Sequence, residues 1–165
     1  MQQAQGAIDA ARAAGADAYA HTEFTAAQDA LKQAREAAGQ HDYQSALNHA
    51  LDSRERAQNA AKEAADRKAT ARGDAERALS DLTAALTEAR VKLKAAESSH
   101  VAAKTLVRPR QAIADGEQAV QKARAAFGQG DYLAVAGIAT PAAARLITVA
   151  RDLDAVTAIL GRRRR

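Results

Sequence analysis

The chain has 165 residues, no cysteine and a formal net charge of +4. The lack of cysteine excludes disulfides, thiolate metal sites and thiol catalysis. Roughly three in ten residues are alanine and only 3% are aromatic, a composition that favours closely paired helices over a globule built around a wide pocket. The last four residues, Arg162 to Arg165, carry the charge excess, because without them Lys+Arg falls from 24 to 20, equal to the 20 Asp+Glu.

The first part of the chain predicts two helices. Ala, Gln, Glu, Lys, Arg and Leu dominate, and β-branched residues never form an alternating run, so we expect no strand. A short helix over residues 3–14 should end near Gly15. A second helix should begin after His21, with Thr22 as its N-cap, and continue to Gly39.

A bend is predicted where the second helix ends, in the stretch GQHDYQSALNHAL. Gly39 can adopt the left-handed conformation that closes a helix, and Asp42 can cap the next one. We expect the ring of Tyr43 to wedge into the apex of this bend with its hydroxyl in water.

The same phrase returns as GQGDYLAVAGIAT, 89 positions later (131 − 42). Gly128, Asp131 and Tyr132 take the places of the stop, the cap and the apical ring. We therefore predict a duplicated helical hairpin with these three residues at its second bend.

The segment between the two bends predicts long helices. Residues 42–98 contain no proline, and Gly73 is a possible break, so this helix is either continuous or restarted there. Apolar residues at three-four spacing from Leu79 to Ala96 form a coiled-coil seam. A turn at residues 98–100 should precede a helix that is bent or restarted at Pro109.

The last helix has a seam that keeps the three-four spacing from Tyr132 to Leu160. Thr140 and Pro141 have the pattern of an N-cap followed by a first helical residue, so we expect a kink or a restart there. A seam of this length also suits a partner helix from a second copy of the chain.

The predicted fold is therefore all-α: antiparallel helical-bundle or coiled-coil hairpins, duplicated, with a long central helix and an elongated arrangement. We place a first hairpin repeat at residues 1–73, a second at residues 74–161 and a basic tail at residues 162–165. The two repeats could also form one continuous body.

Two family resemblances follow from these motifs. The bend with its spaced alanines resembles tetratricopeptide-like hairpins, although their usual period is 34 rather than 89. The stretch AGADAYA (residues 14–20), an alanine-rich helix and the Gly-Asp-Tyr bend more closely resemble an uncharacterised family of alanine-rich helical domains of bacterial envelope proteins and lipoproteins. This resemblance implies a periplasmic or outer-membrane-associated helical protein with no catalytic residues.

Candidate reactive sites are sparse. His49 and Asp52 share a helical face and could supply two metal ligands, but residues 137–138 replace Asn48 and His49 in the second copy, so we predict no metal site. No nucleophile elbow or phosphate loop is visible, so we expect neither enzymatic activity nor a cofactor. No apolar run approaches the ~18 residues of a membrane span and no signal peptide is visible.

The leading functional hypothesis is a non-catalytic scaffold or spacer of the bacterial cell envelope, with protein partners or self-association through the helical seams. Membrane attachment would then depend on a lipid anchor not seen in the sequence. The alternative is a cytoplasmic polyanion- or nucleic-acid-binding helical protein that acts through Arg162, Arg163, Arg164 and Arg165.

Overall fold

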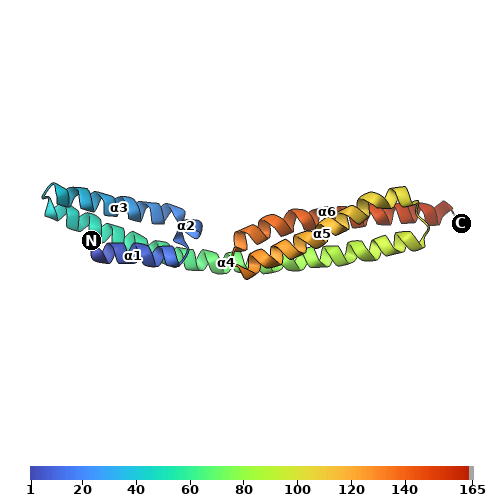
Figure 1. Cartoon of the computed structure of the whole chain (residues 1–165), viewed down its shortest axis with the longest axis horizontal. Coiled ribbons are helices and arrows are strands. Elements are labelled where there is room, and N and C mark those ends of the chain that lie inside the picture. Colours follow the sequence, from blue (N-terminus) through green and yellow to red (C-terminus); the bar gives the residue numbers. More distant parts are fainter. Residues whose placement is uncertain (164–165) are drawn as a thin grey trace. The chain divides into compact units, whose positions relative to one another are not determined.

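The computed structural model describes the backbone of residues 1–163 and the side chains of residues 1–159. Those residues form helices joined by short turns, without a strand, which confirms the all-α prediction (Figure 1). The helices are α1 (Gln2–Ala13), α2 (Ala16–Tyr19), α3 (His21–Gly39), α4 (Tyr43–Ser98), α5 (Ala103–Gly128) and α6 (Tyr132–Arg163).

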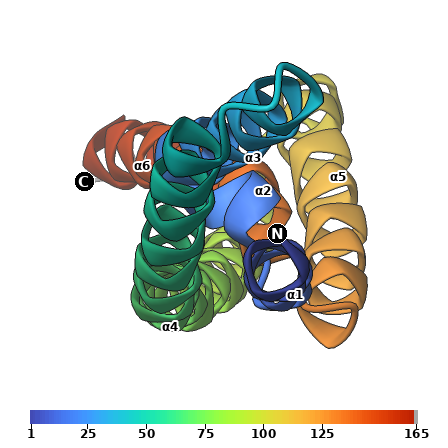
Figure 2. The same cartoon turned by 90° about the vertical axis from the view of Figure 1, so that its left-hand side faces the viewer.

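The chain divides into two compact units, Met1–Thr70 and Ala71–Arg165. The division lies three residues before the expected one at 73/74. The first unit contains α1, α2, α3 and the first part of α4, and Figure 2 shows α1 nearly end-on beside α3 and α4. The second unit contains the rest of α4 with α5 and α6. Each predicted hairpin is therefore completed by a third helix.

The core of the first unit consists mainly of alanine, with a few larger side chains from α1 and α3. Ile8, Phe24 and Leu31 pack with buried alanines of α1, α3 and α4. The guanidinium carbon of Arg12 lies 5.6 Å from the centroid of the Phe24 ring. The buried hydroxyl of Ser53 donates a 2.8 Å hydrogen bond to the carbonyl of Ala27, so α4 and α3 are tied by one polar contact within an apolar seam.

The second unit has larger core residues and a close helix approach. Leu82, Val135 and Leu146 are almost fully buried in its main cluster. A Cβ atom added at Gly116 of α5 would lie 2.8 Å from Cδ1 of Leu146 in α6, so only glycine fits there without displacing that leucine. A second cluster at the other end joins Ala96, Val101, Leu106 and Leu153.

The link between α1 and α3 differs from the prediction. Gly15 has φ +87° and is followed by the short helix α2, which the sequence pattern did not predict. The N-cap prediction for Thr22 is wrong, because α3 begins at His21 and Ala20 occupies the cap position without a side-chain hydrogen bond. Because the left-handed Gly15 turns the chain directly after α1, helical geometry resumes at Ala16, well before Thr22.

The long helices pass through every proposed break. α4 runs through Gly73 as one helix of 56 residues, and α5 and α6 contain Pro109 and Pro141 in their interiors. The predicted restart at Pro141 is therefore wrong, as is the N-cap role of Thr140. A proline inside a helix removes one backbone hydrogen bond, and its ring crowds the carbonyl four residues earlier. For Pro141 that carbonyl belongs to Gly137, which lies in open surroundings: an added Cβ would meet nothing within 4 Å.

Candidate functional site

The first bend closes α3 through a pair of reverse-turn hydrogen bonds. The amide of Asp42 donates to the carbonyl of Ala37 at 3.0 Å, and that of His41 donates to Ala38 at 3.1 Å. This is the Schellman pattern, in which the residue after the C-cap is left-handed. That residue is His41, with φ 62°, whereas Gly39 is still helical, so the left-handed role predicted for Gly39 is wrong.

The second bend repeats this geometry with glycine in the left-handed position. Asp131 donates its amide to Ala126 and Gly130 donates to Phe127, each at 3.0 Å. Gly130 has φ +78°, and Gly128 is the last residue of α5. The two left-handed positions, 41 and 130, are again 89 residues apart.

Both aspartates of the bends accept a backbone hydrogen bond from the helix that follows. Oδ1 of Asp42 accepts from the amide of Ser45 at 3.0 Å, and Oδ1 of Asp131 accepts from that of Ala134 at 3.1 Å. Hydrogen bonds from the side chain and amide of Ser45 lower the pKa of Asp42 from its ordinary value. Each carboxylate thus satisfies an amide that the helix itself cannot pair.

The two apical tyrosines lie in different surroundings. Tyr132 is half-buried, and its ring centroid is 5.3 Å from that of Phe127. Tyr43 is 69% exposed, and its hydroxyl lies 3.1 Å from Nδ1 of His41. The wedged position predicted for Tyr43 is therefore wrong. Alanine at position 38 replaces the phenylalanine against which the second tyrosine packs.

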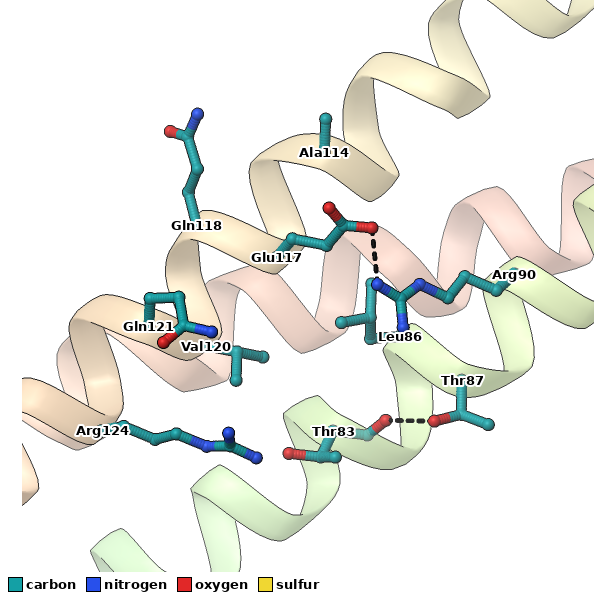
Figure 3. Close-up of a pocket in the computed structure, with 10 residues that line it drawn as sticks. All are labelled: Thr83, Leu86, Thr87, Arg90, Ala114, Glu117, Gln118, Val120, Gln121 and Arg124. Atoms are coloured by element: carbon teal, nitrogen blue, oxygen red, sulfur yellow. Dashed lines mark hydrogen bonds and ion pairs between the residues drawn. The ribbon is translucent and has the colours of Figure 1, made fainter.

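A groove of about 500 Å³ between α4 and α5 was not predicted (Figure 3). Nη2 of Arg90 and Oε1 of Glu117 form a 2.6 Å ion pair across it. The hydroxyls of Thr83 and Thr87 donate to carbonyls of their own helix, at 2.8 and 2.9 Å, so their protons are already engaged within α4. Residue spacing within one helix cannot show that Arg90 of α4 faces Glu117 of α5, so no signal in the sequence indicated this groove.

Arg124 is the distinctive cation of this groove. In Figure 3 its side chain extends from α5 toward Thr83. It forms no ion pair with the part of the chain that the structure describes, and it also lines an adjoining hollow with Leu79 and Phe127. Glu76 and Glu88 also line the adjoining hollow, so the two grooves together present both signs of charge beside apolar side chains.

Among the described residues, histidine and carboxylate side chains do not gather into groups of three or more that could hold a metal ion. Arg162 and Arg163 lie at the end of α6, but their side chains are outside the described residues, and Arg164 and Arg165 are outside them altogether.

One helix of the described residues, α6, is long and apolar enough to cross a membrane, over Tyr132–Ile159. The expectation of no such segment was based on uninterrupted apolar runs, whereas this helix qualifies on average composition. Its seam packs in the core of the second unit through residues such as Val135 and Leu146. The core helix of a helical bundle has the same length and composition, so these two properties of α6 are weak evidence of a membrane span.

The chain matches no protein-family model, no curated protein and no solved structure.

Proposed function

We propose that this chain is a non-catalytic structural or protein-interaction scaffold of the bacterial cell envelope. The observation that carries the proposal is α4, one helix of 56 residues that contributes to the cores of both units. A helix shared in this way couples two binding units through a continuous backbone. The assignment to the envelope rests on the resemblance of the AGADAYA stretch and the two bends to envelope domains.

The two units are proposed to be copies of one ancestral hairpin. Both bends have the same pair of reverse-turn hydrogen bonds and the same aspartate cap, at a constant offset of 89 positions (131 − 42). A duplicated hairpin supplies two related surfaces on one chain, which suits a spacer that holds partners by helix packing.

Cell fractionation tests the envelope proposal. An antibody raised against the purified chain should detect the protein of the source bacterium in the periplasmic or membrane fraction. A cytoplasmic marker protein serves as the control for leakage. Recovery of the chain with that marker alone would contradict the envelope assignment.

The four C-terminal arginines support the second candidate function, polyanion binding in the cytoplasm. When a protein neutralises Z phosphates of duplex DNA, the logarithm of its binding constant falls with the logarithm of salt concentration with a slope of about −0.9Z. Replacing Arg162–Arg165 with glutamine should therefore reduce the magnitude of this slope by up to about four. The matched control is replacement of four arginines within the helices. Equal DNA binding by the tail variant and the unaltered chain would reject this candidate.

A further inference from the structure

An apolar strip lies beside the first bend, on the opening turns of α4. Tyr43, Leu47 and Leu51 are spaced four residues apart and therefore share one helical face. They are 69%, 60% and 53% exposed. Three large apolar side chains in line are unlike the single exposed apolar residues found elsewhere on a soluble surface.

The strip continues the surface on which α1 is seated. Arg54, one turn beyond Leu51 on α4, donates to Oε1 of Gln3 at 3.0 Å, and Arg35 of α3 donates to Oε1 of Gln5 at 2.8 Å. Figure 1 shows that α1 begins part-way along the α3–α4 hairpin, with the bend extending past it. Among the described residues, no third helix covers the hairpin from there to the bend.

The second unit shows what covers the corresponding place. There, residues 74–88 of α4 line a groove with the first half of α6, and Ala78, Thr140 and Ala143 are among the lining residues. Ala75 and Leu79 belong to the core that contains Val135. Positions 136 and 140 of α6 correspond to Leu47 and Leu51 (47 + 89 and 51 + 89). Ala136 is half-buried, and the exposed Thr140 lines the groove beside α4, so in the second unit a helix lies next to this face.

We propose that the strip of Tyr43, Leu47 and Leu51 binds an amphipathic helix of a partner protein. The partner helix would present an alanine- and leucine-rich face, as residues 75–82 of α4 do in the second unit, and would lie in line with α1. The proposal rests on the scaffold function given above and names the class of partner that this scaffold holds.

The size of the strip argues for a partner helix rather than a second copy. A standard interface buries ~800 Å² per partner, far more than three side chains can supply. Two strips facing each other would bury little else, whereas a helix lying in line with α1 would also extend the packing that α1 makes against α3 and α4. The expected affinity is weak, because much of the favourable burial offsets the cost of association.

The test uses the covering helix of the second unit as the probe. A synthetic peptide with the sequence of residues 71–86, ARGDAERALSDLTAAL, is added to the isotope-labelled full chain up to about 1 mM, and amide shifts are followed by NMR. We expect shifts centred on Tyr43, Leu47 and Leu51. Leu47→Lys and Leu51→Lys should each weaken binding by roughly tenfold or more. Leu133→Lys, at a 54% exposed leucine of the second unit, is the matched control and should leave binding unchanged.

Three outcomes would overturn the proposal. These are an absence of shifts, shifts confined to the second unit, and binding that is equal in the Leu47→Lys and Leu133→Lys variants. Sedimentation velocity of the chain alone tests the other occupant, because a dimer abolished by Leu47→Lys would assign the strip to a second copy. None of these results bears on where the protein is found in the cell, so the envelope proposal can fail or survive separately.

Discussion

The ends of α3, α4 and α5 share a left-handed residue, which is histidine at positions 41 and 100 and glycine at position 130. A left-handed conformation costs a residue with a Cβ roughly 1–2 kcal/mol, partly offset by the greater chain entropy of glycine. His41→Gly should therefore raise the free energy of unfolding by about 0.5–1 kcal/mol, measured by urea denaturation. Gly130→Ala should lower it by about 1 kcal/mol. A destabilised His41→Gly variant would show that the contact between His41 and Tyr43 outweighs the backbone strain.

The cap of Asp42 predicts a specific pH dependence. Its pKa is lowered in the folded protein, so the ionised carboxylate contributes stability above its unfolded pKa, about 3.9, and loses this contribution as the pH falls through the folded pKa. Asp42→Asn keeps a capping oxygen without the charge. We expect the unfolding free energy of this variant to fall less between pH 5 and about pH 2 than that of the unaltered chain. An equal fall in both proteins would contradict the assigned role.

Gly116 and Leu146 should be energetically coupled. Gly116→Ala would force Leu146 to move within a packed core and should destabilise the protein by about 1 kcal/mol, although alanine favours a helix. In the Leu146→Ala background the same change should be neutral or stabilising, giving a coupling of roughly 1–2 kcal/mol in a double-mutant cycle. Gly137→Ala, where a Cβ meets nothing within 4 Å, is the control. If the effects of Gly116→Ala and Leu146→Ala on stability were additive, the core would be able to accommodate the added methyl group without displacing Leu146.

Residue-level patterns predicted the bends but not their conformations. The sequence showed that a helix stops near Gly39 and that Asp42 begins the next, because glycine, aspartate and spacing are local signals. Which residue becomes left-handed depends on how far the last helical turn extends. In α3 that turn includes Gly39 and its C-cap Gln40, so the left-handed residue is His41. The surroundings of Tyr43 depend on α1, whose extent along the hairpin no local pattern reveals.

At the scale of the element, the main question is whether α4 is continuous through Gly73. Gly73 lies within this helix, and a Cβ added to it would meet nothing within 4 Å. Gly73→Ala should therefore stabilise the protein by about 0.5–1 kcal/mol through helix propensity alone, measured by thermal or urea unfolding followed by circular dichroism. Destabilisation by this substitution would instead indicate a break in the helix at Gly73.

The sequence predicted the long elements better than their interruptions. Three-four spacing is repeated over many residues, so the seams of α4 and α6 were visible without a structure. A helix can either restart at a proline or continue through it, and the residues next to Pro109 and Pro141 do not distinguish these two outcomes. The packing of the rest of the helix decides between them. The α4–α5 groove requires knowing which faces of two helices meet, and periodicity leaves that choice open.

At the scale of the whole molecule, the boundary between the two units follows an exposed segment of α4. Residues 65–70 are exposed at every position, and they include Arg67 and Lys68. Few tertiary contacts hold this segment, so local opening should cost less here than within either core. Limited trypsin digestion should cut first at residues 67–72 and release two fragments, identified by mass spectrometry. A first cut within residues 80–150 would contradict this order of local stability.

A seam of identical small side chains looks nearly the same after a slide of one heptad, so it sets the distance between two helices better than their alignment. In the first unit, the hydroxyl of Ser53 meets the carbonyl of Ala27 in one alignment only. Position 116 corresponds to Ala27 (27 + 89), and there the alignment is marked by shape, because Gly116 receives Leu146. Alignment is thus marked by a polar contact at Ala27 and by a steric fit at Gly116, so two positions 89 residues apart use different chemistry for the same purpose.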